Sequence, residues 1–162
     1  MNATESGFSE TVYLAAAEER LNTAFKLLND DVPDYVMATY LGGVAVECLF
    51  HAYRMRAGFE DVGKHNLAIQ AELGGFYADM KPELRQRVTG YIGEVVARWQ
   101  NNHRYRSKDA LRQYVVTKRL FIVEGKTTTK QDVVQFNAER LLDATDALLK
   151  IGKFRWNNSS PT

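Results

Sequence analysis

The chain has 162 residues, of which 45% are apolar, 21 are Lys or Arg, 20 are Asp or Glu and only 3 are Pro. A chain of this length can bury about 70% of its unfolded surface, so the composition predicts one globular domain rather than two. The lone Cys48 excludes an intramolecular disulfide. The N-terminus is polar, and no apolar run approaches the length of a membrane span. Together with the unpaired cysteine, these features predict a cytoplasmic protein without a membrane segment.

Charge is distributed unevenly along the chain. The net charge is −7 over residues 1–80, +7 over residues 81–119 and +1 over residues 120–162. Residues 81–119 are called the basic segment below. A local concentration of Lys and Arg is typical of proteins that bind phosphate backbones, whatever their total charge. The alternative is a solvated basic helix face that acidic neighbours neutralise, and the sequence favours neither.

The first two predicted elements are long helices. Apolar residues at helical spacing predict helices over 10–29 and 33–57, and Pro33 is expected at the first helical position of the second. That second helix is apolar nearly all round, which predicts the central, most buried element. Gly42 and Gly43 lie inside it at a cost of roughly 1 kcal/mol each, which predicts that another backbone packs closely there.

The rest of the chain continues the helical pattern. Further helices are predicted over 66–73, from Pro82 to about 101–102, over 108–120 and over 130–151, with the segment LFIVEG (120–125) left open as a short strand or a loop. Thr129 and Asp132 have the spacing of a capping box before the last helix. Residues 1–9 are expected to be a polar segment, and 152–162 a disordered tail.

One short strand cannot form a sheet, so the fold class is predicted to be all-α. We expect an up-and-down bundle of four to five helices that forms a single domain over residues 10–151.

The residues best suited to catalysis lie in the basic segment. Arg98 and His103 could act on a phosphodiester, because His transfers protons near neutral pH and Arg stabilises a phosphate whose charge grows in the transition state. Residues five apart on a helix point about 140° from each other, so the two converge only if the helix ends between them. The alternative is that both cations cap a helix C-terminus while Trp99 belongs to the core.

Neither a metal nor a cofactor is predicted. Gly125-Lys126-Thr127 lacks the earlier Gly of a P-loop, and one Cys with three scattered His gives no zinc pattern. Glu47 and His51 lie four apart on one helical face, and we expect a buried hydrogen-bonded pair there.

Three stretches of the sequence resemble the HEPN superfamily, the all-α higher-eukaryote and prokaryote nucleotide-binding domains. Residues 40–52 resemble the buried helix of that family, and residues 64–67 (KHNL) resemble its His-Asp-Leu helix start. Arg98-x4-His103 fits the Arg-x(4–6)-His ribonuclease motif, and Arg104-Tyr105 resembles a pair found in many members.

The resemblance implies a metal-independent endoribonuclease that works as a homodimer, possible roles being a toxin or a phage-defence effector. His103 would be its general acid or base, and Arg98 would hold the scissile phosphate. An antitoxin or a nucleotidyltransferase would be the partner protein. The remaining candidate RNA-binding residues are Asn101, Asn102, Arg104, Tyr105, Arg106 and Lys108.

Two other functions stay open at the level of sequence. Trp99 follows Arg98 where catalytic members often have a polar residue, which favours a non-catalytic HEPN module that binds nucleotide, nucleic acid or a partner protein. A purely structural bundle that dimerises through the apolar second helix is the third possibility.

Overall fold

The computed structural model describes residues 8–59, 65–127 and 132–158, and these residues form an all-α fold, as predicted. The α-helices are α1 (Glu10–Leu28), α2 (Tyr35–Arg56), α3 (Leu67–Leu73), α4 (Pro82–Arg98), α5 (Lys108–Thr117) and α6 (Val133–Asn158). A 3₁₀ helix, η1 (Asn101–Tyr105), joins α4 to α5, and β1 (Ile122–Val123) pairs with β2 (Lys126–Thr127) in an antiparallel hairpin. Residues 120–125 (LFIVEG), for which the sequence allowed a short strand or a loop, thus contain a short strand.

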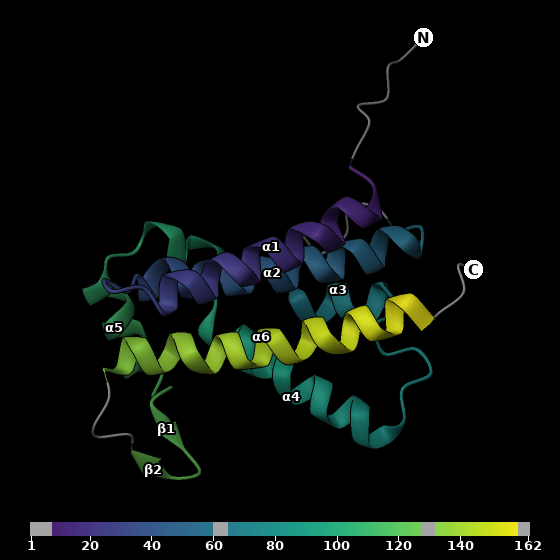
Figure 1. Cartoon of the computed structure of the whole chain (residues 1–162). Coiled ribbons are helices and arrows are strands. Elements are labelled where there is room, and N and C mark those ends of the chain that lie inside the picture. The colour runs from purple at the N-terminus through teal and green to yellow at the C-terminus, as the bar shows by residue number, and fades with distance from the viewer. Residues whose placement is uncertain (1–7, 60–64, 128–131, 159–162) are drawn as a thin grey trace.

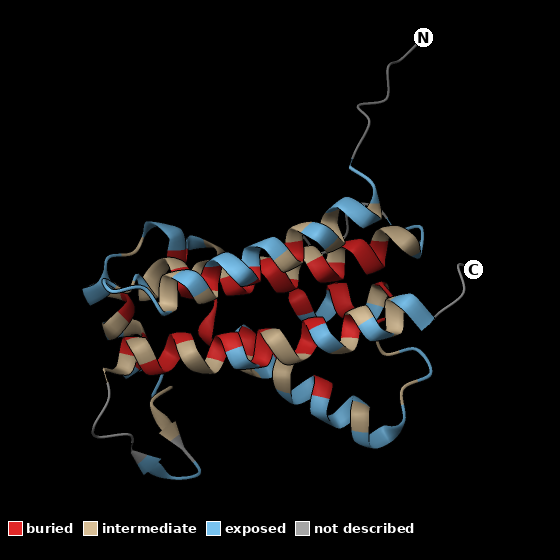
Figure 2. Ribbon diagram, viewed as in Figure 1, coloured by how far each residue is buried: buried red, intermediate tan, exposed pale blue. Residues whose placement is uncertain are grey.

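The long helices α1, α2 and α6 lie side by side, and α2 is the central one (Figure 1). It packs against α1 and α6 along its length, and it also contacts α3 and η1. The buried faces of α1, α2 and α6 point toward one another (Figure 2). The main core results, into which α4 contributes Val88, Ile92 and Val95. A smaller cluster of Leu111, Val115 and Val134 lies between α5 and the start of α6.

Side chains of neighbouring elements pack tightly against α2 at Gly42 and Gly43. A Cβ at Gly43 would overlap the indole of Trp99, and one at Gly42 would overlap Leu141 and Leu142 of α6. The neighbours are side chains rather than the backbone that the sequence suggested.

The start of α2 differs from the prediction by two residues. Asp34 is the N-cap, with Oδ1 accepting a hydrogen bond from the Met37 amide at 2.9 Å, and Pro33 therefore precedes the helix. An Asp side chain can satisfy a free first-turn amide and Pro cannot, so the cap sets the boundary. At the other end of the chain the predicted cap residue Thr129 lies outside the described residues.

Helix α6 runs to Asn158, whereas the sequence predicted a disordered tail from residue 152. Its last two turns are packed: Gly152 contacts Leu49 and Phe76, and its carbonyl accepts a hydrogen bond from the Tyr53 hydroxyl at 2.6 Å. The Trp156 ring lies edge-on to Tyr53. These contacts come from residues a hundred positions earlier, so no local pattern at 152–158 indicates them.

The predicted Glu47–His51 pair does not form. Glu47 Oε1 lies 2.5 Å from His65 Nδ1, which precedes α3, whereas His51 Nδ1 bonds to Arg54 and its ring packs on Tyr13. Residues four apart share a helix face, but here Glu47 bonds to His65 and His51 to Arg54 instead of to each other.

Helix α2 is the one helix in the described ranges that is long and apolar enough to cross a membrane by length and composition alone. The sequence predicted no membrane segment. Half of its most apolar window is buried inside the bundle, and core helices of globular proteins meet the same criterion. The burial therefore explains the apolar character without a membrane.

Candidate nucleic-acid interface

The Arg98–Tyr105 region begins where α4 ends. Trp99 leaves the helix with an extended backbone (φ −114°, ψ 137°), and its indole Nε1 donates to the Tyr40 carbonyl at 3.1 Å. Trp99 is buried in the core, as the sequence suggested for it. The chain then turns through η1, whose start is capped by the side chains of Gln100 and His103. The helix thus ends between Arg98 and His103, three residues earlier than predicted.

Arg98 is buried, with 4% of its surface exposed, and its Nε and one terminal nitrogen are hydrogen-bonded. Nε donates to Glu94 Oε2 at 2.7 Å, and one terminal nitrogen donates to the Leu120 carbonyl at 3.0 Å and to Asn137 Oδ1 at 3.2 Å. Arg98 therefore ties the end of α4 to the turn after α5 and to α6.

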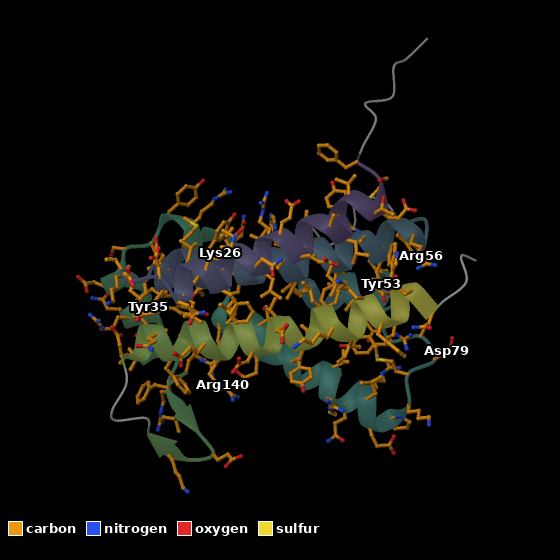
Figure 3. All side chains as sticks on the ribbon, in the orientation of Figure 1. Lys26, Tyr35, Tyr53, Arg56, Asp79 and Arg140 are labelled. Carbon is orange, nitrogen blue, oxygen red and sulfur yellow. The ribbon has the colours of Figure 1, made fainter. Side chains whose placement is uncertain are left out.

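Glu94 joins this cluster to a second cation. Its other carboxylate oxygen accepts a hydrogen bond from Arg140 at 2.9 Å, and Arg140 is labelled on α6 in Figure 3. Burial raises the pKa of the Glu94 carboxyl, but the hydrogen bonds and charges of Arg98 and Arg140 outweigh it, so the pKa lies below its usual value. The carboxylate stays ionised at neutral pH and holds both guanidinium groups in place.

His103 is fully enclosed, with 0% of its surface exposed. Its Nδ1 accepts a hydrogen bond from the Gln100 amide at 3.3 Å, and its ring packs edge-on against Tyr114 of α5 with centroids 5.0 Å apart. Burial, helped by the charge of Arg106, lowers the pKa of His103 to about 4. The imidazole is therefore neutral at pH 7 and carries its proton on Nε2, which has no hydrogen-bond partner among the described residues.

Arg98 and His103 have different contacts, although the helix ends between them. Arg98 bonds to Asn137 of α6, whereas His103 packs against Tyr114 of α5, and no hydrogen bond in the described structure joins the two. Each catalytic candidate is therefore held by its own set of neighbours.

The other candidate residues of the interface are accessible, and they lie on two different surfaces. Asn102, Arg104, Tyr105 and Lys108 are exposed, while Asn101 and Arg106 are half-buried. Asn101 lines a hollow of about 510 Å³ together with His65, Asn66, Leu67, Val96, Trp99 and Gln100.

Arg104, Arg106 and Lys108 line a different hollow, here called the α2–η1 groove, of about 540 Å³. Its other lining residues come from the start of α2 and the turn before it: Val32, Pro33, Asp34, Tyr35, Val36 and Met37. Tyr35 is labelled in Figure 3, at the end of the bundle where α5 also lies (Figure 1).

Each cation of the α2–η1 groove stacks on a tyrosine. The guanidinium carbon lies 4.7 Å from the Tyr105 ring centre for Arg104 and 4.9 Å from that of Tyr114 for Arg106. The Lys108 ammonium lies 5.4 Å from the Tyr35 ring centre. Such stacking fixes a cation in place. Arg104 also forms a hydrogen bond with the Tyr40 side chain and Arg106 donates one to Gln100, and a guanidinium has five N–H donors, so others remain for a ligand.

Acidic neighbours neutralise only part of the basic segment. Within the described ranges, four of its cations form ion pairs: Arg85 with Glu72, Arg98 with Glu94, Lys108 with Asp132, and Arg112 with Asp109 and Asp132. Its other cations have no carboxylate within ion-pair distance in those ranges; they are Lys81, Arg87, Arg104, Arg106, Lys118 and Arg119. Ion pairing to acidic neighbours therefore accounts for part of the basic segment, and Arg104 and Arg106 lie outside that part.

Sequence reasoning missed the second wall of the groove. The predicted helix 33–57 includes Asp34 and Tyr35, and nothing in their local pattern places them beside residues seventy positions later. One missed signal was present: Glu94 lies four residues before Arg98, the spacing and order that favour an ion pair on a helix. That pair indicates a structural role for Arg98.

No metal-binding group stands out in the parts of the chain that the structure describes: no three His, Cys, Asp or Glu side chains lie together there. A scan against protein-family models gave no match, and searches of curated proteins and of solved structures gave none either.

Proposed function

We propose that this chain is a non-catalytic RNA-binding module of the HEPN type that works in the cytoplasm and binds RNA through η1 and the start of α5. The observation that carries this proposal is the contrast between two sets of cations in the basic segment. Arg104 and Arg106 stack on tyrosines, line a groove and lack a carboxylate partner among the described residues, whereas Arg98 is enclosed and paired with Glu94.

The family assignment rests on the sequence resemblance and agrees with the fold. Residues 40–52 form the middle of the buried helix α2, and Arg98-x4-His103 lies at the end of a long amphipathic helix of an all-α bundle. Both placements are compatible with a HEPN domain. Fold alone does not fix activity, so the function is argued from the side chains.

Burial argues against catalysis by the single chain. A ribonuclease histidine must reach the 2′-hydroxyl or the leaving oxygen and exchange a proton near neutral pH. His103 is enclosed, and its pKa of about 4 leaves it as the neutral imidazole at pH 7, which cannot act as the general acid. Cleavage would require Arg98 and His103 to leave their present positions and to give up the bonds to Glu94, Leu120 and Gln100.

The endoribonuclease is therefore the competing hypothesis, with its homodimeric cleft and its place in a toxin–antitoxin or phage-defence system. It predicts cleavage that depends on both motif residues. Analytical sedimentation of the protein at tens of micromolar tests the homodimer separately. If the protein is a monomer at that concentration, a cleft shared by two copies cannot form.

One experiment separates binding from cleavage. Labelled RNA is incubated in EDTA with wild type, His103→Ala, and the double variant Arg104→Gln/Arg106→Gln. The matched control is Arg87→Gln/Lys118→Gln, which removes two exposed cations that have no carboxylate partner in the described residues and lie outside the groove.

We expect intact RNA and salt-dependent binding by wild type. The Arg104/Arg106 variant should lower the slope of log affinity against log salt by about 1.4, the value for two phosphate contacts to a single strand, while the control changes it little. Cleavage by wild type that is lost in His103→Ala would show an enzyme instead. Absence of binding even at low salt would refute the RNA-binding proposal.

A further inference from the structure

The α2–η1 groove has two walls of different chemistry. One wall carries the cations Arg104, Arg106 and Lys108, which come from the end of η1 and the first residue of α5. The other wall is formed by the turn before α2 and its first residues, and it is mainly apolar. Its members are Val32, Pro33, Tyr35, Val36 and Met37, together with the acidic Asp34.

The basic wall suits a phosphate group. The guanidinium groups of Arg104 and Arg106 lie over tyrosine rings, and planar guanidinium groups offer N–H donors in a fork that matches phosphate oxygens. Arg106 also donates to Gln100 Oε1 at 3.2 Å, which fixes its direction while using one of its five N–H groups. Lys108 shares its charge with Asp132 at 3.1 Å and is the weaker contributor.

The apolar wall suits an unstacked base rather than a duplex. Val32 is 85% exposed, and Pro33, Val36 and Met37 are half-buried. A duplex presents phosphates and sugars to a protein surface and keeps its bases stacked inside, so it gains nothing from such a wall. An unpaired base buries an apolar face against it. Tyr105, at 77% exposure beside the groove, offers a further stacking surface.

The charge of Asp34 provides a test of whether the groove binds an anionic ligand. Among the residues that line the groove it is the carboxylate, facing three cations, and its negative charge opposes an incoming phosphate. Its structural task is to cap α2 through Oδ1. Asparagine caps helices about as well as aspartate, so the charge can be removed while the cap is kept.

We infer that the α2–η1 groove holds one nucleotide of single-stranded RNA, with its phosphate on the Arg104–Arg106 wall and its base against the Val32–Met37 wall, so that the protein selects single strands over duplex. This inference rests on the proposed RNA-binding function and adds the form of the RNA and the second half of the site.

The test uses fluorescence anisotropy of the full chain with a labelled twelve-nucleotide RNA, alone and annealed to its complement. Wild type should bind the single strand at least tenfold more tightly than the duplex. Asp34→Asn should tighten single-strand binding by about two- to fivefold, the range expected from removing one unfavourable exposed charge interaction.

Asp31→Asn is the matched control. It removes the same charge from the same turn at an exposed residue that does not line the groove, so its effect should be smaller. An unchanged thermal midpoint in Asp34→Asn would show that the cap survives.

The outcomes separate this inference from the proposed function. If the duplex binds as tightly as the single strand, or if Asp34→Asn and Asp31→Asn have equal effects, the groove assignment is overturned while RNA binding stands. If neither RNA binds and Arg104→Gln/Arg106→Gln changes nothing, the proposed function fails as well.

Discussion

The indole of Trp99 lies against Gly43, so closely that any side chain at position 43 would overlap the ring. The same indole donates a hydrogen bond to the carbonyl of Tyr40, one turn earlier on α2. This contact fixes where the chain leaves α4 and therefore where the interface residues of η1 lie relative to α2. A disturbance at Gly43 should reach the α2–η1 groove through Trp99.

Replacing Gly43 by Ala should destabilise the fold by about 1–3 kcal/mol, because the new methyl group must displace a buried ring. Gly90 is the matched control: it lies in α4, is exposed and has open space at its Cβ position. Gly90→Ala should stabilise by about 0.5–1 kcal/mol through helix propensity alone. Urea denaturation of both variants checks the pair, and equal effects would contradict the close packing described for Gly43.

Arg98→Ala should destabilise the protein by about 2–4 kcal/mol, somewhat less than a fully buried pair costs, because Glu94 is partly exposed and keeps Arg140. Arg87→Ala, an exposed cation on the same helix, should change the free energy of unfolding by no more than about 0.5 kcal/mol. Thermal unfolding measures both. If Arg98→Ala proved as stable as Arg87→Ala, the hydrogen bonds that join Arg98 to Glu94 and to Asn137 of α6 would contribute nothing measurable to stability.

Stability should fall as pH falls from about 6.5 to 4, and His103 should be one cause. Its pKa is about 4 in the folded protein against about 6.5 in the unfolded chain, so the unfolded chain takes up the proton first and gains relative stability across that window. The contribution is about 3 kcal/mol at most. Glu94 and Asp132, whose pKa values are also lowered, act in the same direction at more acidic pH.

NMR titration of the His103 ring measures the effect directly. The signal should show no protonation until the pH approaches 4, and His103→Gln should flatten the pH dependence of the unfolding free energy between 6.5 and 4. A His103 midpoint near 6.5 would mean that the imidazole is solvated, and it would revive the ribonuclease hypothesis.

Tyr53→Phe should cost about 1 kcal/mol, because it deletes the buried hydrogen bond to the Gly152 carbonyl and leaves the ring packing intact. Tyr105→Phe, an exposed tyrosine, is the control and should change stability little. Truncation after residue 151 should cost more than Tyr53→Phe, since it also removes Gly152 and Trp156. Chemical denaturation ranks the three, and a harmless truncation would show that 152–158 adds nothing to the core.

Periodicity predicted the helices well because each of them buries a regular apolar face. It failed where a distant residue decides. The end of α4 depends on Trp99 meeting Gly43 and Tyr40, fifty-odd residues earlier, and the last turns of α6 depend on Tyr53. The local sequence at 99 or 152 contains no trace of either partner.

The candidate site shows the same division between local and distant information. Local sequence placed Arg104, Tyr105 and Lys108 on an exposed surface, but it could not show that Arg98 and His103 are enclosed. Their surroundings include Asn137, Leu120 and Tyr114, which belong to elements that follow in the chain. The one local indication was the spacing of Glu94 and Arg98, which favours an ion pair on the helix and hence a structural role for Arg98.

Helix α6 extends across the bundle and buries residues against α1, α2 and α4 (Figure 1). Because a ribosome releases the N-terminal part of a chain first, α1 and α2 can pack together early, but the surfaces of α1, α2 and α4 that α6 covers stay exposed until it emerges. A nascent chain stalled before residue 133 would expose those surfaces to chaperones and proteases.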